Sequence, residues 1–323
     1  MSEKDVASKE YLENEKRIAD IINVTYFEGQ QVVLPEHVHT RKCRSAIQKR
    51  KNNRRKSNEI IRDIANCVDI QTKTVNISIE VQSEVHYAMP LRVLGGDYAQ
   101  YQEQWRKIKE LHKRENDLKG AEYLSKFTKE DRLIPGLTIV LYMGVEPWDG
   151  PKCLKDMLDL SGLPESMILQ IGDYPLYIID VRRYQEYEKF TTDLKYVFGF
   201  LQRDQSGDAL YQYVNEHKEA FSHLAEDAFD LIAQYSGSWQ KLKVYKNDSY
   251  KKEGEFDMCK AIDDLMEKSE KRGYDNGYGN GNMQGILFVI KNMGFGRSEA
   301  LDNLIKGMNI TKEKAEEYVD LYW

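Results

Sequence analysis

The sequence predicts an α+β fold followed by a helical C-terminal region. Residues 74–82 alternate apolar and polar side chains with the period of a strand that has one buried face. Residues 134–142 form an almost continuous apolar run, which is typical of a strand buried on both faces. Between these strands apolar residues recur at helical spacing, and helical patterns predominate from residue 193 onward.

The composition is that of a globular protein. The chain has 323 residues, of which 31% are charged and 41% are hydrophobic, enough for one large domain or two small ones. No apolar run approaches the roughly 20 residues of a membrane span, and the first five residues lack the layout of a signal peptide. The four cysteines are scattered without a CxxC pair, so we expect reduced thiols in a cytoplasmic protein.

The first expected element is a helix over about residues 5–25. Ile18, Ile21 and Ile22 supply its apolar stripe, and it ends near Gly29. Taken by itself, Glu15 on this helix has the character of an ordinary surface glutamate.

A strongly basic block follows. The net charge of -6 argues against a protein that coats nucleic acid, yet nine Lys and Arg residues lie between Arg41 and Lys56 without one acidic residue. Such a block attracts phosphates through charge and counterion release. By charge alone, a solvated linker and a DNA-binding segment are equally good interpretations.

Residues 61–69 and 74–82 are expected to pair as a hairpin folded about Gln71 and Thr72. In a hairpin the numbers of opposed residues have a constant sum, so position 69 faces 74 and position 63 faces 80. Asp63 and Glu80 are then directly opposed on one face of the sheet.

Two opposed carboxylates repel each other unless one is protonated or a cation bridges them. The hairpin therefore predicts a metal site at Asp63 and Glu80, with Gln82 on the same face as Glu80. Asp69 is the competing partner of Glu80, but that pairing would place the turn inside the β-rich run 73–75. A solvated strand face is the simpler interpretation of residues 74–82 alone.

The position of the basic block favours DNA contact. The block leads directly into Asp63, so phosphates that bind it would lie near the predicted metal. Arg50, Arg54 and Arg55 are the candidate phosphate ligands.

These motifs resemble the PD-(D/E)XK nuclease superfamily and, within it, the YhgA-like (Rpn) recombination-promoting nucleases, which are also labelled PD-(D/E)XK family transposases. The three-residue active-site pattern alone has little specificity, whereas the ordered set of motifs is specific. The similarity covers roughly residues 10 to 200 and lies in segments 14–23, 62–63, 79–82, 87–92, 97–98 and 144–151.

The resemblance implies a restriction-endonuclease-like core, a mixed sheet flanked by helices, over residues 5–203. It implies an endonuclease that hydrolyses DNA phosphodiester bonds in recombination or transposition-like processing. Asp63, Glu80 and the backbone carbonyl of Val81 would hold Mg²⁺, with Mn²⁺ as an alternative, because hard ions prefer oxygen ligands. Glu15 matches the family position that brings a carboxylate to the edge of the metal site.

Many relatives have a lysine where this chain has Gln82. An amide is neither a base near neutral pH nor a positive charge, so Gln82 is expected to orient the attacking water.

The long helix over about residues 90–114 should begin with Pro90 in its first turn. Arg92 is expected to bind a phosphate bidentately. Two glycines, Gly95 and Gly96, precede Asp97 where the family has a larger residue, and each costs the helix about 1 kcal/mol. The stripe expected to pack on the sheet consists of Leu94, Tyr98, Tyr101, Trp105, Ile108 and Leu111.

The C-terminal part should comprise a helical region over 204–272, a glycine-rich linker over 273–284 and a helical appendage over 285–323. Ser298 and Thr311 are the expected N-caps of the appendage. This appendage is a candidate interaction or oligomerisation module, which would make the protein a homo-oligomer.

Two other functions stay open. A DNA-binding protein without catalysis would keep the basic block and the fold. Gly95 and Gly96, which depart from the family pattern before Asp97, support this alternative. A regulatory interaction protein would act through the helical C-terminal half and would not need the basic block.

Overall fold

In the computed structural model the described residues are 3–40, 44–51, 54–61, 64–246, 248–252, 255–292, 296–308 and 310–323. They form two compact units, Met1–Cys259 and Lys260–Trp323. This boundary lies within helix α11 (Met258–Asn292), whereas the sequence predicted boundaries after residues 203, 272 and 284. No helix in the described part of the chain is both long and apolar enough to cross a membrane.

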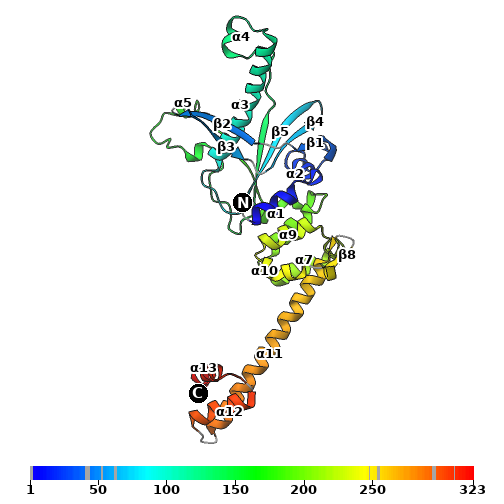
Figure 1. The fold of residues 1–323 in the computed structure, drawn as a ribbon, viewed down its shortest axis with the longest axis vertical. Coiled ribbons are helices and arrows are strands. Elements are labelled where there is room, and N and C mark those ends of the chain that lie inside the picture. The colour runs from blue at the N-terminus through cyan, green and yellow to red at the C-terminus, as the bar shows by residue number, and fades with distance from the viewer. Residues whose placement is uncertain are drawn as a thin grey trace. The chain divides into compact units, whose positions relative to one another are not determined.

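Five strands among the described residues form one mixed sheet in the first unit (Figure 1). The first two pairs in the sheet are antiparallel and the last two are parallel. With helices on both faces, this arrangement confirms the predicted α+β class with a mixed sheet. The strands, in sheet order, are β1 (Val38–Thr40), β4 (Ile64–Ile70), β5 (Lys73–Gln82), β6 (Gly136–Tyr142) and β7 (Tyr177–Asp180).

The β4–β5 hairpin has the predicted register. Asp69 lies opposite Thr74 and accepts a hydrogen bond from its hydroxyl at 2.7 Å, and Ile64 lies opposite Ile79. The competing pairing of Asp69 with Glu80 is therefore wrong. Asp63 lies outside the described residues, so its opposition to Glu80 stays a prediction.

The two faces of the sheet differ in chemistry because side chains alternate along each strand. One face presents Ile77 and Ile79, both fully buried. Helix α2 (Glu15–Phe27) covers this face, since it contacts β1 at one edge and its Tyr26 packs against Tyr177 of β7 at the other. The opposite face presents Ser78 and Glu80 to helix α3 (Met89–Glu115).

The N-terminal helix is split in two, where the sequence predicted one helix over 5–25. Helix α1 (Glu3–Leu12) ends before Asn14, and the Asn14 side chain accepts a hydrogen bond from the Lys16 N–H. This N-cap starts α2 with Glu15 as its first residue.

Helix α3 is continuous across Gly95, but it packs on the sheet through a different face from the predicted stripe. Its buried residues include Val93, Asp97 and Gln100, while Tyr98 and Trp105 are exposed. The facing strands carry polar side chains, so polar helix residues pack there. The sequence prediction used only the spacing of apolar residues, and it therefore chose the neighbouring apolar stripe of the helix.

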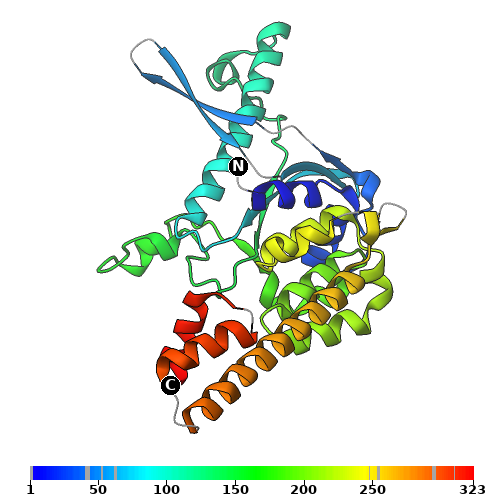
Figure 2. The same ribbon diagram turned by 60° about the horizontal axis from the view of Figure 1, so that its bottom comes forward.

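The basic block forms a two-stranded antiparallel ribbon, β2 (Arg44–Lys51) with β3 (Arg54–Ile61). Both strands contact α3, and the ribbon extends away from the main sheet (Figure 2). Its strand structure argues against a simple linker.

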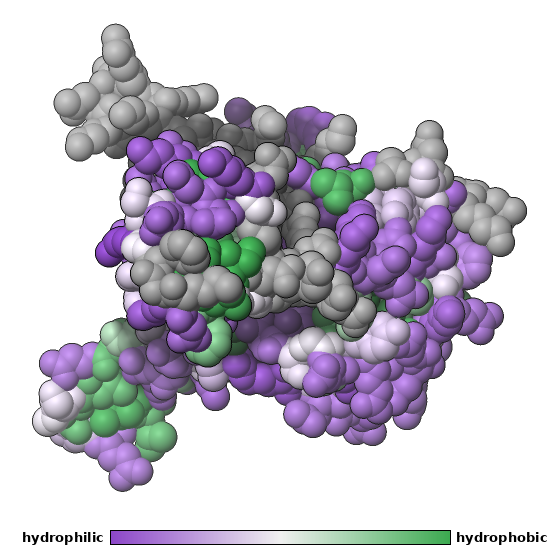
Figure 3. Space-filling view, turned by 90° about the horizontal axis from the view of Figure 1, so that it is seen from below, coloured by the Kyte–Doolittle hydropathy of each residue, from purple (hydrophilic) through white to green (hydrophobic). Residues whose placement is uncertain are grey.

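The connection from β6 to β7 exposes apolar side chains. None of residues 151–172 is buried, and four apolar side chains are exposed: Leu158, Leu163, Met167 and Leu169. Apolar residues gather on this projecting part at the lower left of Figure 3.

Further helices complete the first unit. Helix α9 packs against α1 and α6, which joins the C-terminal helices of the unit to its N-terminus. These elements are α4 (Gly120–Ser125), α5 (Glu165–Ile168), α6 (Leu194–Arg203), α7 (Gly207–Glu216), α8 (Lys218–Ser222), α9 (Glu226–Tyr235), α10 (Trp239–Leu242), β8 (Lys251–Lys252) and β9 (Glu255–Phe256).

The second unit consists of α11, α12 (Arg297–Met308) and α13 (Lys312–Tyr322), whose apolar side chains form a core of their own. The predicted linker over 273–284 lies inside α11. No proline interrupts this stretch, and extending a helix from formed turns is easier than starting one. Thr311 is confirmed as an N-cap, whereas Ser298 lies inside α12, which begins at Arg297.

Candidate active site

Glu80 lies at the centre of the candidate site. It is 3% exposed, because its place in β5 points it beneath α3. Its Oε2 is 3.0 Å from Nη2 of Arg92, whose side chain is 40% exposed. Pro90 is in the first turn of α3, as predicted, and Arg92 follows in the same turn. The structure therefore brings together two of the predicted site residues, as an ion pair.

A row of polar contacts continues along the same face. The Gln100 amide donates to the Ser78 hydroxyl at 3.0 Å. On the next strand the Thr138 hydroxyl donates to Asp97 at 2.8 Å, and Asp97 also accepts a hydrogen bond from the Tyr174 hydroxyl. The sequence predicted none of these contacts. The one indication that Asp97 matters was that it lies in segment 97–98, one of the motifs that resemble the nuclease family.

The backbone carbonyls of Val81 and Gln82, at the end of β5, both accept hydrogen bonds. The Gln82 amide group donates to the Val81 carbonyl at 2.7 Å. The backbone carbonyl of Gln82 accepts a hydrogen bond from the Met143 N–H at 2.8 Å. Gln82 is half-buried. Its hydrogen bond holds the side chain beside the Val81 carbonyl, which the resemblance predicted to bind a metal.

Two segments that are distant in the sequence, 87–92 and 144–151, meet next to this strand end. The Tyr87 hydroxyl donates to Asp149 at 3.1 Å. Trp148 packs edge-on against Tyr142 at the end of β6, with ring centroids 5.2 Å apart. The segments 87–92 and 144–151 therefore form one contact region.

Glu15 and the ribbon arginines belong to other elements than the strand that carries Glu80. Glu15 is exposed at the start of α2, on the helix that covers the opposite face of the sheet. The ribbon register places Arg50 opposite Arg55 and Arg54 opposite Lys51. Asp63 lies outside the described residues.

The donor set at the end of β5 fits a hard divalent cation. The Glu80 carboxylate, the Val81 carbonyl and the Gln82 amide oxygen are ligand types that Mg²⁺ prefers. Arg92 contacts Glu80, and the Gln82 amide contacts Val81. A metal ion would take over or share these two contacts.

A buried arginine, Arg17, forms a cluster that the sequence did not predict. Arg17 donates to Asp193 at 2.8 Å and to Asp227 at 3.0 Å, and its guanidinium lies 3.8 Å from the Tyr11 ring centroid. Burial raises the pKa of Tyr11 well above its usual value. This cluster joins α1 and α2 to the starts of α6 and α9, which indicates a structural role.

Asp20, a buried carboxylate on α2, has a structural role. Its carboxylate accepts hydrogen bonds from the backbone N–H and hydroxyl groups of Thr191 and Thr192.

No protein-family model matches the chain, and neither a curated protein nor a solved structure matches it. The family resemblance therefore stays a prediction from the sequence motifs.

Proposed function

We propose that this protein is a Mg²⁺-dependent DNA endonuclease of the PD-(D/E)XK type, which hydrolyses phosphodiester bonds in recombination or transposition-like DNA processing. The observation that supports this function best is the buried carboxylate of Glu80 on β5, which is followed in the same strand by the oxygen donors of Val81 and Gln82. A buried carboxylate is costly unless a cation compensates it. Arg92 is one such cation, and a metal ion would be another.

The order of elements agrees with this proposal. The β4–β5 hairpin is followed by the crossover helix α3 and then by the buried strand β6. In the nuclease superfamily that the sequence resembles, the core has this same order of a strand hairpin, a crossover helix and a buried strand.

Asp63, Glu80 and the Val81 carbonyl would hold Mg²⁺, with Mn²⁺ as an alternative. A bound ion would lower the pKa of the water molecule that it binds and would neutralise charge on the phosphate. Gln82 would orient the attacking water through its amide, since it cannot accept a proton near neutral pH.

The chain also offers groups that hold the DNA. Arg92 is half-exposed and would contact a phosphate once it leaves Glu80. The ribbon would contact the DNA backbone through Arg50, Arg54 and Arg55. The major groove of B-DNA admits a two-stranded β-ribbon, so the observed shape suits this role.

The test is incubation of the full chain with supercoiled plasmid, with Mg²⁺ or with a chelator. We expect metal-dependent nicking that Glu80→Gln abolishes without loss of DNA binding. Glu84→Gln, an exposed residue shortly after β5, is the matched control and should nick like the unchanged protein. Loss of folding in Glu80→Gln, measured by circular dichroism, would show that Glu80 is structural.

A second candidate function is DNA binding without catalysis. The Glu80–Arg92 ion pair favours it, because the carboxylate already has a cation at 3.0 Å. Plasmid binding without nicking in either Mg²⁺ or Mn²⁺ would support this alternative over the nuclease.

A further inference from the structure

The C-terminal end of α3 carries a second cluster of metal-ligand side chains, remote in sequence from Glu80. One ligand atom each from His112, Glu115 and Asp117 lies within 4.8 Å of the others. His112 and Glu115 are three residues apart on one face of the helix. Asn116 ends the helix with φ 51°, a left-handed cap that turns Asp117 back toward His112.

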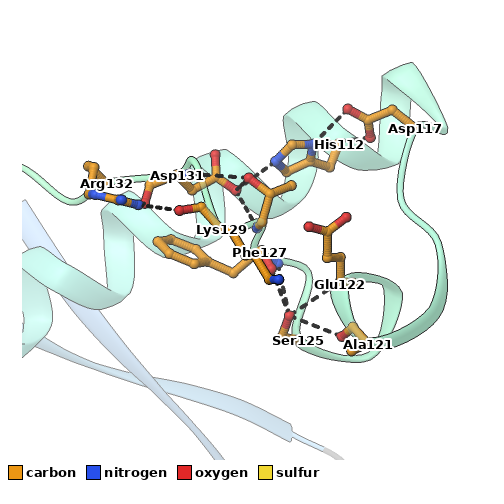
Figure 4. A network of polar contacts seen from close by, with 10 residues as sticks. His112, Asp117, Ala121, Glu122, Ser125, Phe127, Lys129, Asp131 and Arg132 are labelled. Atoms are coloured by element: carbon orange, nitrogen blue, oxygen red, sulfur yellow. Dashed lines mark hydrogen bonds and ion pairs between the residues drawn. The ribbon is translucent and has the colours of Figure 1, made fainter.

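His112 is held between two carboxylates (Figure 4). Its Nδ1 lies 3.0 and 2.9 Å from the two oxygens of Asp117, and its Nε2 lies 2.9 Å from Asp131. Asp131 is itself fixed, because it accepts hydrogen bonds from the N–H and the hydroxyl of Thr128. The ring is buried, so its orientation is set on both sides.

This arrangement matches a metal-ligating histidine. Such a histidine usually donates its other ring N–H to a carboxylate, which fixes the ring and raises its basicity as a ligand. Asp131 is placed to accept from Nε2, which leaves Nδ1 for a cation next to Glu115 and Asp117. The negative end of the helix dipole at the end of α3 also favours a cation.

The simpler interpretation is a pure ion-pair clasp without metal. In that form hydrogen bonds to Asp117 and then to Asp131 raise the pKa of His112. The clasp explains both ring contacts, but it assigns no role to Glu115, whose carboxylate lies in the same cluster.

We propose that His112 Nδ1, Glu115 and Asp117 form a Zn²⁺ site at the C-terminal end of α3, while Asp131, which follows α4 in the chain, holds the His112 ring from its other side. One imidazole nitrogen and two carboxylate oxygens are a set that zinc accepts, with water in the remaining position. Imidazole suits zinc better than magnesium, so this site differs in chemistry from the oxygen donors on β5. The inference does not depend on the proposed nuclease function.

The experiment is calorimetric titration of Zn²⁺ into the full chain, prepared without a histidine tag and freed of metal by a chelator. We expect saturable binding that Glu115→Gln and His112→Gln abolish, and that excess Mg²⁺ does not prevent. Glu115 is exposed, so Glu115→Gln should fold normally. This variant still tests the proposal if His112→Gln does not fold. Asp131→Asn should weaken binding roughly 10- to 100-fold, because it only orients the ring.

Two controls separate this site from other zinc binding. His39→Gln removes an exposed histidine that also contacts an aspartate, at 3.1 Å, and should leave zinc affinity unchanged. Glu80→Gln should leave it unchanged too, even if nicking is lost.

A thermal unfolding scan gives a second readout. Zn²⁺ should raise the melting temperature of the unchanged protein but not that of Glu115→Gln. Absence of zinc binding, or equal binding by Glu115→Gln and the unchanged chain, would overturn the proposal and leave His112 as an ion-pair clasp.

Discussion

Two arginine–carboxylate contacts in the first unit have opposite patterns of burial. At Arg17 the guanidinium is buried, with 5% of the side chain exposed, and its partners Asp193 and Asp227 are 24% and 30% exposed. At Arg92 the carboxylate partner Glu80 is the buried group, and 40% of the arginine side chain is exposed.

The difference indicates different roles. Arg17 cannot leave its place without exposing the core that surrounds it, so it acts as a fixed link between helices. Under the proposed function, the exposed Arg92 would move into solvent and leave Glu80 for a metal ion. We therefore infer that the contacts of Arg17 are permanent and that a metal ion would exchange with Arg92.

The largest expected effect is at the fixed link. Arg17→Met should destabilise the protein by roughly 3 kcal/mol. This value is near the lower end of the range for breaking a buried ion pair, because both carboxylates are partly hydrated. Urea unfolding measures this. Arg106→Met is the control, since its pairs with Glu103 and Glu110 are exposed, and it should cost at most about 1 kcal/mol. Equal costs for the two variants would contradict the assignment of Arg17.

The ribbon extends the comparison to Arg50, Arg54 and Arg55, which are proposed to contact DNA phosphates. Each neutralised phosphate adds about 0.9 to the slope of log affinity against log salt. Replacing Arg50, Arg54 and Arg55 with alanine should therefore flatten the slope by about one to three units, with little change in nicking at saturating DNA. The control replaces the exposed Lys109, Lys113 and Arg114 of α3. An unchanged slope in the ribbon variant would assign the basic block to a solvated ribbon.

The exchangeable contact should respond to metal. Arg92→Met leaves the buried Glu80 without this cation and should cost roughly 1 to 2 kcal/mol in chelator, less than at Arg17 because Arg92 is half-exposed. Mg²⁺ should restore part of this loss, since a ligand that binds only the folded state stabilises it. Melting temperatures with Mg²⁺ and with chelator measure the effect. No stabilisation of Arg92→Met by Mg²⁺ would count against a metal at Glu80.

The smallest effect concerns the helix that presents Arg92. Gly95→Ala should stabilise the protein by up to about 1 kcal/mol, because an added Cβ meets nothing within 4 Å. Gly199→Ala on α6 is the matched control and should destabilise, because its Cβ would overlap the Tyr213 ring. If Gly95→Ala stabilises the fold but lowers nicking, freedom at the start of α3 is needed for Arg92 to move.

The sequence by itself determined the features that depend on neighbours along the chain. The period-2 pattern of 74–82 and the turn at Gln71 predicted β5 and the register that pairs Asp69 with Thr74. The apolar run predicted β6, and Pro90 predicted the start of α3. Each of these follows from side-chain alternation or backbone preference within a few residues.

Only the tertiary structure decided which polar groups meet. Arg17 contacts Asp193 and Asp227 across 176 and 210 positions, and no local pattern encodes those separations. The face of α3 that packs on the sheet was decided by the polar strands beneath it. The cluster at His112 required the left-handed cap at Asn116, which brings Asp117 back onto the helix. Local preferences set the elements, but the energy of burying charged side chains depends on partners supplied by distant segments.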